Sequence, residues 1–147
     1  ALGKLPSVGL HGDLKLANIA LLSEDRVGFI DWQMTLRAPI AVDLGWFLVS
    51  NSGSLPASPE PIVAEYRQAL EWDSGRWGFG GDANDFAGLT GDWAAQLDLT
   101  WIVGLLLRGW RKGLDAEAGV VLASRSSAGD DLAWWCQRAV EAADRRL

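Results

Sequence analysis

The sequence predicts a mainly α-helical fold that carries one small β-hairpin. The chain has 147 residues, of which 49% are hydrophobic and 22% charged, enough for a single domain with its own core. Several long segments repeat apolar residues every three or four positions, the period of a helix packed on one face. Two short apolar stretches, 19–22 and 27–30, are joined by four polar residues and predict the hairpin.

The amino-terminal part is expected to hold an extended segment, a loop and this hairpin. Residues 7–10 are interpreted as a short entry strand or extended segment, and the polar-apolar mix 11–18 that follows is typical of a loop. Functional side chains are concentrated on loops that a rigid framework positions. Residues 7–32 are therefore the part of the chain in which we look for chemistry.

Helices are expected over the rest of the chain. Residues 41–50 and a segment capped by Ser58 have helical periodicity, whereas the glycine-rich stretch 73–91 has none and is interpreted as a loop. The strongest pattern, 92–112, opens with an acid and closes with bases, which complements a helix dipole. We expect it to be the central helix, in a helical subdomain spanning 92–147.

The last helix is predicted over 130–147. Its apolar residues recur at spacings of three and four, and Cys136 falls on that stripe, so we expect a buried structural thiol.

Composition excludes several classes of protein. A formal charge of −6 disfavours nucleic acid as a partner and would suit a cationic substrate. One cysteine cannot form an internal disulfide, and one histidine leaves too few ligands for a typical zinc site. Residues 1–10 have no charged region followed by an apolar stretch, so we do not expect them to be a signal peptide, and the most apolar run, 99–107, is too short to span a membrane. We expect a cytoplasmic protein without membrane or nucleic-acid partners.

The segment from His11 to Asn18, with Asp31 beyond the hairpin, carries the pattern most informative about function. Phosphoryl transfer needs a group that orients the acceptor hydroxyl and takes its proton, and metal ions that neutralise the phosphate oxygens. Asp13 can do the first, while Asn18 and Asp31, at the two ends of one hairpin, offer oxygen ligands to Mg²⁺. Paired strands lie about 4.8 Å apart, so the hairpin can bring these ends together.

His-Gly-Asp followed by Asn18, then Ile-Asp-Trp, resembles the aminoglycoside phosphotransferase and choline kinase superfamily over residues 8–48. The resemblance implies the carboxy-terminal lobe of a kinase-like fold and the use of ATP and Mg²⁺. It assigns Asp13 as the catalytic aspartate and Asn18 and Asp31 as metal and nucleotide ligands. His11 would brace the loop.

Two further residues enter through the same resemblance. Asp43, in an Asp-Leu-Gly sequence, corresponds to an acid whose carboxylate accepts hydrogen bonds from the catalytic-loop backbone. Lys15 matches the Asp-x-Lys spacing of protein kinases, so we expect it to assist catalysis by reaching the γ-phosphate.

The sequence has no glycine-rich strand pair before the loop, so we expect the nucleotide-gripping amino-terminal lobe to be missing from this fragment. Its absence would leave apolar surface exposed and favour self-association. The interpretation is an ATP-dependent O-phosphotransferase acting on a small hydroxylated molecule, inactive as the isolated chain. The alternative is a non-catalytic kinase-like binding module. Acids that could meet a cationic substrate are Asp82, Asp85 and Asp98, although solvated or hydrogen-bonded acids are the commoner explanation.

Overall fold

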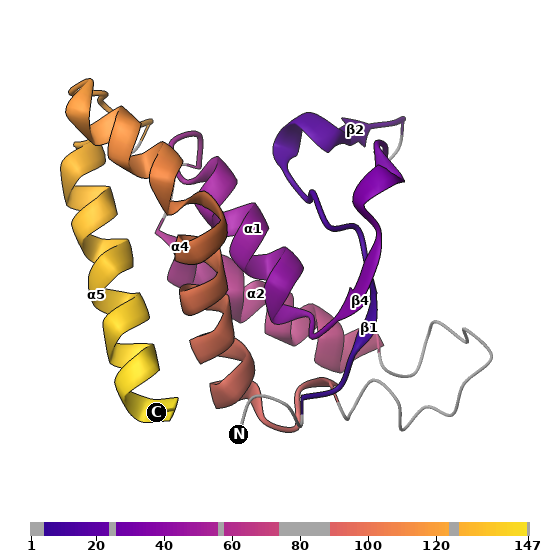
Figure 1. Ribbon diagram of the computed structural model, residues 1–147. Coiled ribbons are helices and arrows are strands. Elements are labelled where there is room, and N and C mark those ends of the chain that lie inside the picture. Colours follow the sequence, from indigo (N-terminus) through magenta and orange to yellow (C-terminus); the bar gives the residue numbers. More distant parts are fainter. Residues whose placement is uncertain (1–4, 24–25, 56–57, 74–88, 124–126, 147) are drawn as a thin grey trace.

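The computed structural model describes residues 5–23, 26–55, 58–73, 89–123 and 127–146. Within them the chain is mostly helical, with two small antiparallel sheets (Figure 1). The elements in order are β1 Val8–Leu10, the 3₁₀ turn η2 Leu16–Asn18, β2 Ile19–Leu21, β3 Val27–Phe29, the 3₁₀ turn η3 Trp32–Met34, β4 Leu36–Ala38, α1 Ala41–Asn51, α2 Pro59–Asp73, α4 Trp93–Glu117 and α5 Ala128–Arg146.

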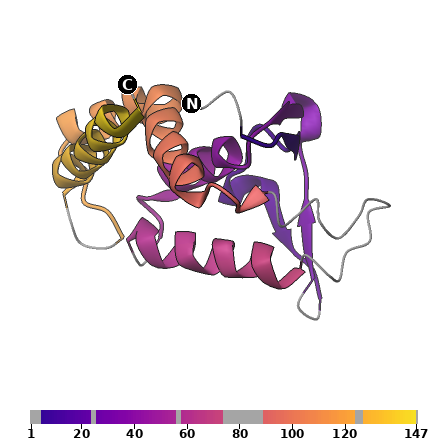
Figure 2. The same cartoon turned by 90° about the horizontal axis from the view of Figure 1, so that it is seen from below.

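Helix α4 is the centre of the bundle, as its sequence predicted. It packs between α1 and α5, and the two sheets lie on the far side of α1 (Figure 1). Helix α2 runs along another side of α1, away from α5 (Figure 2). Three indole rings, those of Trp101, Trp134 and Trp135, meet edge to face in the α4–α5 contact. These three tryptophans therefore contribute to packing.

The amino-terminal end of α4 is fixed by the expected acid. The Asp92 carboxylate accepts a hydrogen bond from the Ala95 amide at 3.0 Å, which satisfies one of the free N–H groups of the first turn. The predicted carboxy-terminal end is wrong, because the helix continues to Glu117. Arg108, Arg111 and Lys112 consequently lie within the helix rather than at its end.

Helices α1 and α4 cross at Gly45 and Gly104. A Cβ atom at Gly45 would lie 2.6 Å from the Thr100 carbonyl oxygen, and one at Gly104 would lie 2.7 Å from a methyl group of Val49. Only glycine allows the two backbones to approach so closely. This contact sets the position of α1, and α1 in turn supports the loop described below.

The hairpin prediction is confirmed, but a second sheet accompanies it. Strands β2 and β3 pair with Ile19 opposite Phe29. Strand β1, predicted as a short strand or extended segment, pairs with β4 so that Val8 lies opposite Ala38. The single predicted hairpin is thus joined by a second two-stranded sheet, and both are formed by the first 38 residues.

Two side chains differ from or refine the sequence interpretation. Cys136 is exposed, so its expected burial is wrong. The buried face of α5 is formed instead by Ala128, Trp135, Ala139 and Ala142. Asp98 is buried and accepts hydrogen bonds from Arg145 and Arg146, which agrees with a structural role rather than a substrate contact.

Asp82 and Asp85 lie outside the described residues. No helix within the described ranges is long and apolar enough to cross a membrane.

Candidate active site

The loop between β1 and η2 depends on glycine at position 12. Gly12 has a φ of 83°, and a Cβ atom there would lie 2.0 Å from the Met34 carbonyl oxygen. A side chain would therefore meet both an unfavourable backbone conformation and a steric clash. The structure thus explains why glycine stands between His11 and Asp13, where protein kinases have arginine.

Asp43, in the first turn of α1, anchors this loop to the helix. Its carboxylate accepts one hydrogen bond from the His11 amide at 2.7 Å and a second from the Gly12 amide at 2.9 Å. All three residues are buried. A buried carboxylate with two backbone donors is a strong, geometrically defined clamp. The loop is therefore attached directly to the helical bundle.

His11 connects the loop to the far end of the hairpin. Its Nε2 lies 2.8 Å from the Ile30 carbonyl oxygen, and its Nδ1 lies 3.3 Å from the Asp13 amide nitrogen. A carbonyl can only accept and an amide can only donate, so the proton belongs on Nε2. The ring also lies 4.7 Å from that of Trp32. His11 thus braces the backbone on both sides of Asp13.

Asp13 is buried and receives three side-chain donors. Lys15 Nζ lies 2.5 Å from Oδ2, Asn18 Nδ2 donates to the same oxygen at 3.1 Å, and Trp46 Nε1 donates to Oδ1 at 2.9 Å. Burial by itself raises the pKa of the Asp13 carboxyl, but the hydrogen bonds and the Lys15 charge together outweigh it and hold the pKa below its usual value. Asp13 is therefore an oriented carboxylate at neutral pH.

The two residues expected to ligate metal stand at adjoining ends of the hairpin. The Ile30 amide donates to the Asn18 carbonyl oxygen at 3.0 Å, so Asp31 directly follows a residue paired with Asn18. Asn18 is buried and its Nδ2 is bonded to Asp13, which leaves its Oδ1 as the side-chain atom able to accept or ligate.

Asp31 has a φ of 65°, a left-handed conformation that aspartate tolerates better than most residues. Its carboxylate is exposed and has no hydrogen-bond or ion-pair partner within the described parts of the chain. The described residues contain no group of three or more His, Cys, Asp or Glu side chains able to hold a metal ion. Asn18 and Asp31 alone therefore fit only a cation held mainly by other oxygens.

Trp46 is the contact that sequence reasoning missed. It lies one turn after Asp43 on α1, so its indole reaches the same loop from the same helix. The spacing Asp-x-x-Trp at the start of a helix was the only available signal, and a tryptophan on a buried helix is more often a packing residue. Here the indole N–H, the one hydrogen-bond donor of the ring, donates to Asp13.

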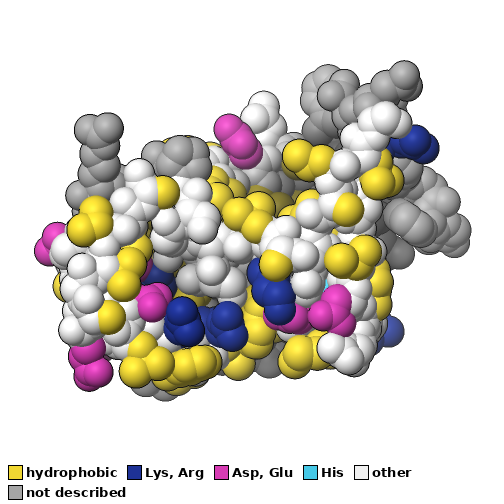
Figure 3. All heavy atoms as spheres, turned by 90° about the horizontal axis from the view of Figure 1, so that it is seen from above, with side chains coloured by type: hydrophobic (Ala, Val, Ile, Leu, Met, Phe, Trp, Pro, Cys, Tyr) yellow, Lys and Arg dark blue, Asp and Glu magenta, His cyan; other side chains and the backbone are white. Residues whose placement is uncertain are grey.

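The surrounding surface is mixed in charge. Seen from above, Lys and Arg side chains and Asp and Glu side chains form a band that runs from the side of α4 and α5 to the side that carries the hairpin (Figure 3). The band lies among apolar side chains.

The geometry defines a class: a buried aspartate on a loop braced by a histidine, with an amide and a second aspartate at the ends of an adjoining hairpin, is typical of kinase-like phosphotransferases. Residues 1–79 match the model of the phosphotransferase enzyme family. The chain belongs to that family. Comparison with curated proteins and with solved structures finds no match.

Proposed function

We propose that this chain is the catalytic lobe of an ATP-dependent O-phosphotransferase that acts on a small hydroxylated molecule. The observation that carries the proposal is the Asp13 carboxylate, which is buried, ionised and aligned by donors on both oxygens. Membership of the phosphotransferase family supports the reaction class. The helical part over 92–147 is the proposed substrate side.

Asp13 would accept a hydrogen bond from the acceptor hydroxyl and so direct its oxygen at the γ-phosphorus. As the new O–P bond forms, the bond between the γ-phosphorus and the bridging oxygen breaks, ADP leaves, and the hydroxyl proton passes to Asp13. A low pKa makes the carboxylate a weak base, which suits a proton transfer that is late on the reaction path. Lys15 has a flexible stem and can exchange Asp13 for a γ-phosphate oxygen.

Asn18 and Asp31 are the residues that would hold Mg²⁺. Both offer oxygen, the ligand this ion prefers, and two protein ligands suffice where phosphates and water supply the rest. When bound, the ion would neutralise charge on the phosphate oxygens. The exposed Asp31 carboxylate and the remaining Asn18 oxygen fit that role.

The nucleotide base is expected to require an amino-terminal lobe. Apolar side chains are exposed along the hairpin, including Leu21, Leu22, Val27 and Ile30, and such a lobe would cover them. Without it we expect the chain to self-associate through this surface. Sedimentation that shows only monomer over a wide concentration range would exclude this expectation.

The proposed function is tested on the protein expressed from the complete reading frame that contains this chain. Asp13→Asn keeps the shape of the side chain and removes the carboxylate, so turnover should fall about a hundredfold or more, with magnesium-dependent ATP binding and thermal stability little changed. ADP release is measured with amino-sugars, amino-alcohols and hydroxy-acids as acceptors, and Asp144→Asn, at an exposed site, serves as control.

Two results would contradict the proposal. Near wild-type turnover in Asp13→Asn would remove the catalytic assignment. Nucleotide binding that ignores magnesium, with no transfer to any acceptor, would instead favour a non-catalytic kinase-like binding module.

A further inference from the structure

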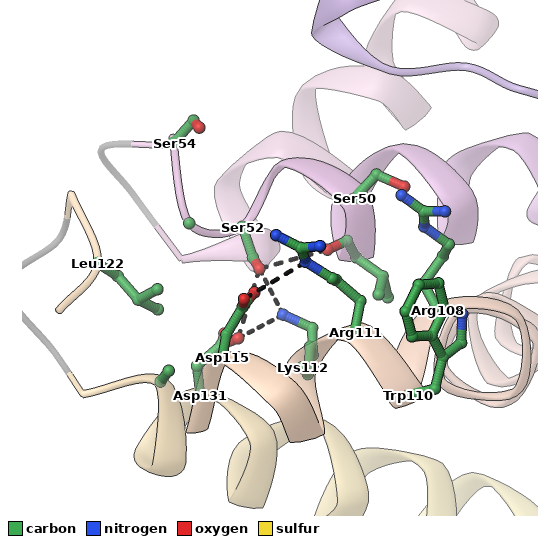
Figure 4. Close-up of a pocket in the computed structure, with 13 residues that line it drawn as sticks. Ser50, Ser52, Ser54, Arg108, Trp110, Arg111, Lys112, Asp115, Leu122 and Asp131 are labelled. Carbon is green, nitrogen blue, oxygen red and sulfur yellow. Dashed lines mark hydrogen bonds and ion pairs between the residues drawn. The ribbon is translucent and has the colours of Figure 1, made fainter. Parts of the chain in front are cut away.

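A second polar site lies beside the candidate active site. A pocket of about 360 Å³ is enclosed by the end of α1, the second half of α4 and the start of α5. Three cations from α4, Arg108, Arg111 and Lys112, line it together with Asp115 and Asp131 (Figure 4). An acidic chain thus has a pocket in which bases outnumber acids.

Two of the three cations are neutralised within the pocket. Lys112 is buried and forms an ion pair with Asp131 and a hydrogen bond with Ser52. Burial lowers the pKa of Lys112, and the contact with Asp131 opposes that shift. Arg111 Nε lies 3.4 Å from Asp115 Oδ1. These contacts leave the pocket with one uncompensated positive charge.

That charge belongs to Arg108. Its guanidinium has no carboxylate and no hydrogen-bond acceptor among the described residues, and its Nε is buried without a partner. Ser50 Oγ, at the same end of the pocket, is also buried and has no partner in the described part of the chain (Figure 4). Buried donors that lack acceptors are rare and costly, and a guanidinium is shaped to receive two oxygens of a carboxylate or phosphate. Both groups are therefore suited to an anionic ligand.

Trp46 connects this pocket to Asp13. Its ring nitrogen donates to Asp13 Oδ1 at 2.9 Å, while the Arg108 guanidinium stacks over the same ring at 5.2 Å from its centre. Arg108 also lies 6.0 Å from the Trp110 ring, which limits its movement. A group bound to Arg108 would consequently be separated from the Asp13 carboxylate, which is proposed to receive the acceptor hydroxyl, by the width of the Trp46 ring.

We propose that the acceptor carries a carboxylate or phosphate group, which Arg108 and Ser50 bind while its hydroxyl meets Asp13. The assignment rests on the proposed function for Asp13, and it differs from the cationic substrate that net charge favours. A short hydroxylated acid or sugar phosphate carries both groups on one small skeleton. Arg108 is then a specificity determinant of the acceptor site.

Anion binding can be measured without turnover. Four probes separate the chemistry: glycerol 3-phosphate and glycerate carry hydroxyl and anion, inorganic phosphate carries the anion alone, and glycerol the hydroxyl alone. Each is titrated into ¹⁵N-labelled protein while the Nε–H signal of Arg108 and the side-chain amide of Asn18 are followed. We expect both anions with hydroxyls to shift both signals, phosphate to shift only Arg108, and glycerol to shift neither.

Variants identify the residue responsible. Arg108→Gln should weaken binding of glycerol 3-phosphate about tenfold or more, because it removes a charge-assisted bidentate contact. Arg108→Lys keeps the charge and should give an intermediate loss. The matched control is Arg138→Gln, since Arg138 also stacks on an indole, 5.3 Å from the Trp134 ring, but already has Glu60 and Glu141 as partners.

The outcomes separate this inference from the proposed function. Equal binding by Arg108→Gln and wild type, or no shift of Arg108 with either anion, would overturn the pocket assignment whatever the fate of transfer activity. A shift of Arg108 with MgADP but not with the hydroxylated anions would assign the pocket to the nucleotide and also overturn it. These binding measurements do not depend on turnover, so loss of turnover in Asp13→Asn would not affect them.

Discussion

Replacing Asp43 by asparagine tests whether this side chain is what holds the loop of His11, Gly12 and Asp13 on α1. The wild-type carboxylate accepts from two buried amides, at 2.7 and 2.9 Å. Asparagine retains one accepting oxygen and turns an NH₂ group toward the other N–H, so one charge-assisted bond is lost and one buried donor stays unsatisfied. We expect the free energy of unfolding to fall by about 2–4 kcal/mol.

Urea unfolding followed by tryptophan fluorescence measures this difference. The m-value, the slope of the unfolding free energy against urea concentration, should stay unchanged if the native state stays compact. Amide exchange at His11 and Gly12 should become faster than elsewhere in the bundle. Asp144→Asn replaces an exposed acid and should change stability by no more than about 0.5 kcal/mol. A loss below about 1 kcal/mol for Asp43→Asn, or unchanged exchange at the loop, would refute the clamp.

Three further outcomes are expected. Gly45→Ala should lower the free energy of unfolding by about 1–3 kcal/mol, because the new methyl group meets the Thr100 carbonyl. The control Gly113→Ala, where a Cβ atom would have nothing within 4 Å, should be neutral or stabilising. Equal stabilities of the two variants would exclude the close crossing of α1 and α4. Burial, and to a lesser extent Asp43, raises the pKa of Tyr66 to about 12, so stability should fall as pH rises from about 10 towards 12. Tyr66 is the chain's one tyrosine, so absorbance at the tyrosinate band should titrate near 12 in the folded protein, and a midpoint near 10 before unfolding would contradict this. The Cys136 thiol is exposed and should react with a thiol reagent in the folded protein; protection until unfolding would place it in the core.

Local patterns in the sequence predicted the elements whose causes are local. The hairpin of β2 and β3 follows from two apolar stretches and a short turn, and the start of α4 follows from the capping acid Asp92. The pairing of β1 with β4 joins segments more than twenty residues apart, and each strand has only three residues. Neither strand is long enough to show the alternation of apolar and polar residues that distinguishes a strand from a loop. Their pairing could therefore not be predicted from hydrophobic periodicity alone.

The same limit applies to the candidate site. The spacing of His11, Asp13 and Asn18 within one loop is visible in the sequence, and the contacts of Asp13 with Lys15 and Asn18 are local. The contact with Trp46 depends on how α1 is rotated, which packing against α4 decides. Cys136 was assigned to the wrong face of α5, because the buried face is formed by Trp135 and three alanines, and this leaves Cys136 and Val140 exposed.

One turn of α1 supplies both the clamp on the loop, from Asp43, and the indole partner of Asp13, from Trp46. Asp31, by contrast, sits at the exposed end of the hairpin. Opening of the hairpin by thermal fluctuation would therefore displace Asp31, the residue proposed to meet the metal. Asp13, the aspartate proposed to meet the hydroxyl, would keep its place because its loop is bonded to α1. The two halves of the proposed site would then have separate local stabilities, and the hairpin would lose its order first on warming.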